Sequence, residues 1–480
     1  MRTGTGTTAS AYSLAFLFML SGWIAGPARA QNQSPAAQPP TFHCQELIRP
    51  HDPDLPQIKP IFRSTTDLSE NEFDCLAWQD LIYLVWPAKA NERGVPDPNQ
   101  KFGAAGPTVW ESYRTADSVF LPEGRDPGPW QELQLMATLE PSLGQQVASG
   151  AVRHLTMTAK VSRPVLTSIL RNTAAFPPPI LDGISQAGGG SLYDLNGYPV
   201  YYEIAMDRPQ YEYIHQNKLY NAYQQATFAR THVINLPSGT KTDPLGAVEV
   251  KAAWKVLSDA ERQSGRFHMV QALLGGSKTP VTVGLVGFHA FIASGQQGAW
   301  ATFSQVDNAP MVRPATSGTF NFFNPQCTVP GTSQPCPFNV KDADPGQVVQ
   351  MARNAKVADA LNTYMHYILQ QCQAQQQCDT NPWQYYNLID VQWPKNPVPL
   401  SSLKAPVSKP LPEGTPNVPE PGGHFVNPVL ETFLQKPGMS CLGCHQYAAT
   451  AAVGIRQPPY RTSYSFVFGR ASAPPTQRQQ

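Results

Sequence analysis

The chain has few charged residues and no excess of either sign. Charged residues make up 14% of its 480 positions, against about a quarter in an ordinary soluble domain. It has 35 Lys and Arg and 34 Asp and Glu, and loss of Arg2 and Arg29 with a leader would leave 33 against 34. Nucleic acid binding favours a basic surface, so no nucleic-acid partner is expected.

Long apolar runs are also missing. Residues 14–20 form an apolar core behind Arg2 that is too short to cross a bilayer as a helix. Ala28 and Ala30 form a small-residue cleavage site, so residues 1–30 are predicted to be a signal peptide, with an uncleaved membrane anchor as the alternative. We expect no transmembrane segment in the mature chain and a periplasmic or secreted localisation.

Common catalytic and nucleotide-binding motifs are absent from the sequence. It has no HExxH motif, P-loop, nucleophile elbow or dinucleotide fingerprint. Metalloprotease, P-loop nucleotide hydrolase and dinucleotide-dependent chemistry therefore have no local support.

Proline is abundant, with 48 residues, about twice the usual share. Nine of the 28 residues from 394 to 421 are proline, which favours an extended chain without a helix. We therefore predict a Pro-rich strap over 394–422 between a large domain, 42–393, and a C-terminal segment, 423–480. Residues 31–41 are polar and Pro/Ala-rich and are expected to be disordered.

Hydrophobic spacing predicts both strands and helices in the large domain. Four segments alternate or run apolar over strand lengths between Gly, Ser and Pro breaks: 247–257, 266–274, 281–292 and 300–306. Four others have helical spacing: 73–86, 108–120, 211–226 and 348–377. The expected fold class is α+β, with a mostly antiparallel sheet plus helices and a C-terminal helical segment docked on it.

The chain has eight cysteines, of which the last two belong to a separate motif. In an oxidising compartment the other six are expected to form disulfides. Proximity in the sequence favours Cys327–Cys336 and Cys372–Cys378, which leaves Cys44–Cys75. A zinc site is the rival interpretation, but the spacings do not match those of zinc ligands.

Cys441-Leu-Gly-Cys444-His445 has the form of a covalent c-type haem attachment motif. Two thiols on one helical turn can bond the two vinyl groups of a haem, and the next residue places an imidazole on the iron. With this composition the motif is expected by chance about 0.003 times. A CxxC redox pair and a zinc half-site are the alternatives. The motif predicts one haem c bonded to Cys441 and Cys444, with His445 as axial iron ligand.

The part of the chain after the motif lacks a second iron ligand. The 35 residues that follow His445 contain no Met, His, Lys or Cys. A sixth ligand is therefore supplied from upstream, is water, or is missing. So short a segment cannot enclose a haem by itself, so we expect the haem to pack against residues 247–310, with the strap running over the surface.

Two upstream histidines are candidates for the distal side of the haem. If Leu274 pairs near Val281 in a hairpin, His268 and His289 project from the same face, whereas a one-residue shift separates them. Gly287 would leave room for a flat ligand. We predict His289 as the sixth ligand, with His268 next. The alternative is two ordinary half-buried histidines.

A short helix is expected just upstream of the motif. Asn427 can cap it and Pro428 suits its first position. Val429 and Leu430 begin apolar pairs with four-residue spacing. These pairs would pack either against one haem face or against the large domain.

Six segments resemble those of exported bacterial "cytochrome c family" proteins of unassigned reaction. The segments are 78–87, 106–113, 248–257, 283–289, 300–310 and 431–445. This resemblance implies haem binding and electron transfer to a redox partner protein, but it implies no substrate.

The expected function is that of an exported mono-haem c-type cytochrome that transfers one electron at a time. One alternative is a haem-dependent oxidoreductase or peroxidase with an open iron site. Another is a module that binds a ligand or partner and carries an auxiliary haem. Two strong protein ligands favour electron transfer, and an open iron favours catalysis.

Overall fold

The computed structural model describes seventeen stretches of the chain, all within the unit Pro40–Gln480. They are residue 44, 70–132, 141–148, 150–155, 192–239, 246–293, 298–310, 318–329, 331–337, 359–379, 381–393, 427–432, 441, 445, 448–453, 459–462 and 464–474. The predicted signal peptide, disordered N-terminus and Pro-rich strap lie outside the described residues, and so does Cys444.

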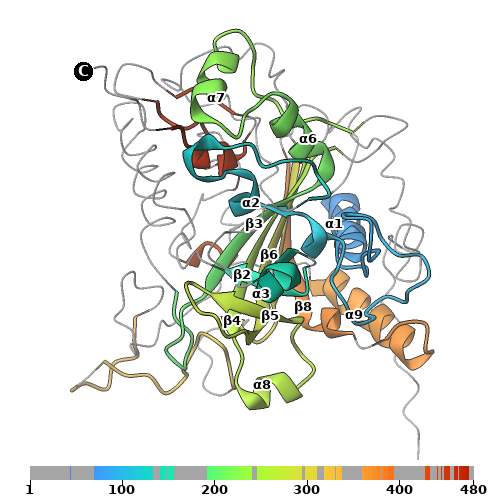
Figure 1. The fold of residues 1–480 in the computed structure, drawn as a ribbon. Coiled ribbons are helices and arrows are strands. Elements are labelled where there is room, and N and C mark those ends of the chain that lie inside the picture. Colours follow the sequence, from blue (N-terminus) through green and yellow to red (C-terminus); the bar gives the residue numbers. More distant parts are fainter. Residues whose placement is uncertain are drawn as a thin grey trace, which may run out of the picture. The chain divides into compact units, whose positions relative to one another are not determined.

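A curled, mostly antiparallel sheet lies at the centre of the described chain (Figure 1). Its strands are β1 Arg114–Thr115, β2 Val152–Leu155, β3 Tyr201–Met206, β4 Val248–Val256, β5 Met269–Leu274, β6 Val281–Ile292, β7 Ala299–Gln305 and β8 Tyr386–Gln392. The order is β1-β3-β4-β6-β5-β2, and β7 pairs with both β6 and β8. Among these pairs only β2 with β5 is parallel. The long strand β6 contacts three others and organises the sheet.

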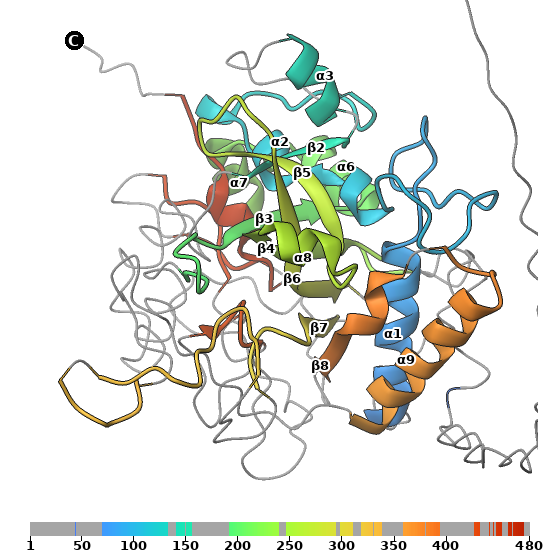
Figure 2. The same ribbon diagram turned by 90° about the horizontal axis from the view of Figure 1, so that it is seen from below.

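Helices surround this sheet. The α-helices are α1 Glu70–Leu84, α2 Ala116–Val119, α3 Pro141–Ala148, α6 Arg208–Gln216, α7 Ala222–Ala229, α8 Asp259–Gln263 and α9 Asp359–Ala374. The 3-10 helices are η2 Trp110–Ser112, η3 Pro122–Gly124, η5 Pro382–Tyr385 and η8 Phe466–Arg470. Figures 1 and 2 both show α1 beside α9 and next to β8. No helix among the described residues is long and apolar enough to cross a membrane. The predicted α+β class is confirmed.

The four predicted strands are present, but two predicted helices differ. The predicted helix over 108–120 is wrong, because Arg114 lies in the extended strand β1 and its buried guanidinium donates to several backbone carbonyls of 118–132. The predicted helix over 211–226 is two helices. Lys218 has a φ of 54°, and Asn221 starts α7 by accepting hydrogen bonds from the backbone of Tyr223 and Gln224. Of 348–377, residues 348–358 lie outside the described residues.

Each face of the sheet meets a different part of the chain. On the helix face, which we define by the side chains of Trp254, Phe288 and Phe303, Trp78 of α1 meets Phe303 at 5.2 Å and Trp110 meets Phe288 at 5.3 Å. The opposite face, defined by Gly287, His289, Phe291, Trp300 and Glu249, contacts described residues between 427 and 474, and we call it the C-terminal face.

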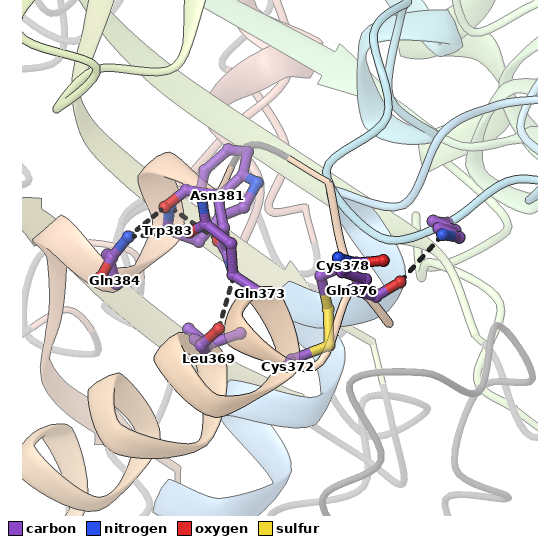
Figure 3. Close-up of a disulfide and its surroundings, with 9 residues drawn as sticks. Leu369, Cys372, Gln373, Gln376, Cys378, Asn381, Trp383 and Gln384 are labelled. Carbon is purple, nitrogen blue, oxygen red and sulfur yellow. Dashed lines mark hydrogen bonds between the residues drawn. A yellow bond between two sulfur atoms is a disulfide. The ribbon is translucent and has the colours of Figure 1, made fainter.

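The three predicted disulfides are present: Cys44–Cys75, Cys327–Cys336 and Cys372–Cys378. Figure 3 shows Cys372–Cys378 at the end of α9, where it closes the turn that leads to Asn381 and η5. The Asn381 side chain accepts a hydrogen bond from the backbone of Trp383 and so starts η5. These bonds fix the approach to β8, which immediately follows η5.

Candidate functional site

Cys441 and His445 both have helical backbone. Cys441 is half-buried and packs against the main apolar core. The structure therefore places the first and last residues of the motif against the body of the protein.

The His445 ring is oriented by a backbone carbonyl. Its Nδ1 lies 2.5 Å from the carbonyl oxygen of Tyr464. A carbonyl can only accept, so Nδ1 carries the proton and Nε2 carries the lone pair of a neutral ring. Tyr464 has a φ of 57°, a left-handed conformation that costs energy for a bulky residue. This strained residue supplies the acceptor that sets the tautomer of His445.

Aromatic side chains surround the His445 ring. The centroid of Phe466 lies 5.0 Å away and that of Trp300 lies 5.8 Å away. Trp300 is 4% exposed and also contacts Phe291, at 4.7 Å, and Tyr464, at 5.6 Å. His445 is therefore held against β6 and β7 by a wall of apolar rings.

Asn427 anchors the segment upstream of the motif. Its side-chain oxygen accepts hydrogen bonds from the backbone of Val429 and Leu430, as a cap does, but residues 428–430 form a turn and not the predicted helix. Its amide donates to the hydroxyl of Thr302 and to the carbonyl of Phe303. Asn427 is fully buried, so these bonds fasten the segment to β7.

Val429 and Leu430 pack on the large domain. They share an apolar cluster with Tyr202 and Val286, and each is 1% exposed. A Cβ at Gly287 would lie 3.3 Å from Leu430 Cγ and 3.4 Å from Val429 Cβ. The room at Gly287, which we expected a flat ligand to use, is taken by these two side chains.

His289 lies on the C-terminal face but already has a strong partner. Its Nε2 is 3.1 Å from both carboxylate oxygens of Glu431. A carboxylate accepts, so Nε2 is the protonated nitrogen in this arrangement. Glu431 also accepts a hydrogen bond from the backbone of Asn427 at 2.8 Å. Ligation of iron through His289 Nε2, as predicted, requires this pair to open.

His268 lies on the other face of the sheet. The Leu285 N–H donates to its carbonyl, while Gly287 pairs with Ala253 and Leu285 with Trp254. The extra residue, Val286, forms a β-bulge that reverses the alternation of β6. The expectation that His268 and His289 share one face is therefore wrong, because it assumed an unbroken ladder.

The His268 side is a buried charge network. His268 Nε2 lies 2.8 Å from Glu111, which is 2% exposed and also accepts from the N–H and hydroxyl of Thr108. Arg153 forms an ion pair with Glu203 and donates to the backbone carbonyl of Glu111. Burial opposes ionisation, but His268, Arg153 and Thr108 together lower the pKa of Glu111 to about 2. This network joins η2 to strands β2 and β3 of the sheet.

The sequence predictions missed Trp300, Glu431 and Tyr464 as parts of the site. The aromatic spacing of 464, 466 and 468 after the motif is a signal that favours a ring wall near a buried group. Comparison of the chain with protein-family models, curated proteins and solved structures found no match.

Proposed function

We propose that this protein is an exported c-type cytochrome that carries one haem on Cys441 and Cys444, has His445 as axial ligand, and transfers one electron at a time to a redox partner protein. The main support is the hydrogen bond between His445 Nδ1 and the Tyr464 carbonyl. Metal-ligating histidines almost always donate their second ring N–H in this way, which orients Nε2 toward the metal. The haem would supply an iron that changes its charge by one.

The large domain would supply the wall that the short C-terminal segment lacks. Trp300 and Phe466 flank His445, and Asn427 fastens the upstream segment to β7. The buried Trp300 Nε1 has no hydrogen-bond partner among the described residues, so this donor fits a polar group of a bound haem. These contacts support the proposal that the haem docks on residues 247–310. The three disulfides agree with export to an oxidising compartment, and the proposal agrees with the resemblance to cytochrome c family proteins.

The attachment is tested on purified protein after denaturation. We expect the haem to stay with the chain in acid–acetone and to give a c-type pyridine haemochrome, because thioether bonds survive unfolding. Cys441→Ala and Cys444→Ala should each remove one thioether and shift the haemochrome band. The double variant Cys372→Ala/Cys378→Ala is the matched control, which removes two cysteines but leaves the motif. Release of all haem into the solvent would refute the proposal.

A second candidate function is a haem oxidoreductase with an iron position open to a small ligand. The observation that favours it is the pair between His289 and Glu431, which engages the predicted sixth ligand. Carbon monoxide separates the two functions. An electron carrier with two protein ligands keeps its ferrous spectrum under carbon monoxide, whereas an open iron binds the gas and shifts its Soret band.

A further inference from the structure

Arg461 is a buried cation without a counter-ion among the described residues. It is 6% exposed, and no described acceptor lies within hydrogen-bonding distance of its Nε. Its backbone pairs with Ala449, close to the motif. Burial lowers the pKa of the guanidinium, an effect that the Tyr464 side chain partly offsets. A buried guanidinium is stable only when an anion or several acceptors compensate its lost hydration.

Other arginines of this protein show how it normally compensates such a charge. The buried Arg153 pairs with Glu203, and the half-buried Arg470 pairs with Asp117. Arg114 instead donates to several carbonyls of one loop. Arg461 has neither arrangement among the described residues. Its burial therefore indicates that its charge is compensated by a group other than these residues.

A second unpartnered donor lies beside the same tyrosine. The Trp300 ring meets the ring of Tyr464 at 5.6 Å and that of His445 at 5.8 Å, and its Nε1 is buried without an acceptor. Tyr464 is also the residue whose side chain interacts electrostatically with Arg461. One buried cation and one buried neutral donor thus both interact with Tyr464, and the Trp300 ring also meets the predicted iron ligand.

We propose that Arg461 and the indole N–H of Trp300 bind a carboxylate, and that this carboxylate is a propionate of the haem carried by Cys441 and Cys444. The inference rests on the proposed function. A guanidinium suits a carboxylate because its planar fork can donate two parallel hydrogen bonds. The indole adds a neutral donor, and both are already desolvated. A free small carboxylate or phosphate has the same chemistry and is the other source of such an anion.

This site controls the charge felt by the iron. An uncompensated propionate beside the haem stabilises the ferric form and lowers the reduction potential, and Arg461 offsets that charge. We therefore expect Arg461→Gln to lower the midpoint potential and Arg461→Lys to restore part of it. Trp300→Phe, which keeps an apolar ring, should lower it by less. Arg470→Gln is the matched control, since Arg470 lies in the same part of the chain but is paired with Asp117.

The experiment is a potentiometric titration of the holoprotein for the wild type and these four variants, after a pyridine haemochrome assay of each. A missing covalent haem in the wild type would overturn the proposed function. A covalent haem with equal potentials in Arg461→Gln, Trp300→Phe and Arg470→Gln would overturn only the propionate site. Stabilisation of wild-type holoprotein by acetate or phosphate, absent in Arg461→Gln, would show that the site takes a free anion and also overturn it. If Arg461→Gln does not fold, Trp300→Phe against Arg470→Gln decides.

Discussion

Two histidine–glutamate pairs lie on opposite faces of one sheet. His268 binds Glu111 within the large domain, and Glu111 is almost fully buried and held by further donors. His289 binds Glu431, whose side chain is 12% exposed and which belongs to the segment leading to the Cys441–His445 motif. The same two residue types thus stabilise a core on one face and fasten a separate segment on the other. The residue types in such a pair do not reveal its role. The role follows from the elements of the chain that supply the two partners.

The largest effect is expected from Glu111→Gln. The folded pKa of Glu111 is lowered to about 2 from an ordinary value of 4.5, which corresponds to about 3 kcal/mol of stability. Because the folded pKa is the lower one, this stability is present above pH 4.5 and is lost as the pH falls toward 2. In urea unfolding at pH 7, 4 and 3, the difference in the free energy of unfolding between wild type and variant should become smaller as the pH falls.

Glu212→Gln is the control for that experiment. Glu212 forms an ion pair with Arg208 within α6, where the Arg208 side chain is 65% exposed, and such pairs contribute little. An equal loss of stability in both variants, or a gap for Glu111→Gln that widens in acid, would contradict the buried network described for the helix face.

A smaller effect is expected on the C-terminal face from His289→Ala and Glu431→Gln. Each removes the same charge-assisted contact, so a double-mutant cycle should give a coupling of about 1–2 kcal/mol. The two variants should therefore destabilise the protein in the same sense. If His289 instead reaches the iron, His289→Ala alone changes the coordination state in the absorption spectrum, while Glu431→Gln keeps it.

The smallest effect is expected from Gly287→Ala. The new methyl group would press on Leu430 and Val429 at 3.3–3.4 Å, which should cost about 1 kcal/mol by overpacking. Gly276→Ala is the control, since nothing lies within 4 Å of its Cβ position. In thermal unfolding, the midpoint temperature should be lower than that of the wild type for Gly287→Ala and unchanged for Gly276→Ala. Equal midpoints for the two variants would mean that residues 427–432 move to accommodate the methyl group at no cost in stability.

Local signals accounted for most of the predictions that succeeded. Alternation and Gly, Ser or Pro breaks define β4, β5, β6 and β7. Short separations identify two disulfide pairs, Cys327–Cys336 and Cys372–Cys378, and leave Cys44–Cys75 as the third. The helix predicted over 108–120 is wrong because the Arg114 side chain donates to carbonyls of the following loop, at Pro127 and Pro129, and the helical spacing of apolar residues does not encode such contacts. The prediction that His268 lies on the same face as His289 is wrong because of one extra residue, Val286. A glycine inside a strand often marks a bulge, so Gly287 carried that signal.

The bonds between the C-terminal residues and α7 should form late in folding. These two parts of the chain lie beside each other in Figure 1. The Gln225 side chain donates to the carbonyl of Phe468, 243 residues away. Contacts of such long sequence separation form slowly because a large loop must close first. They also form only after Phe468, which follows every strand of the sheet in the sequence, has been synthesised. Under the proposed function, this order would leave Cys441 reachable while the sheet assembles, so that haem could be joined before the segment is covered.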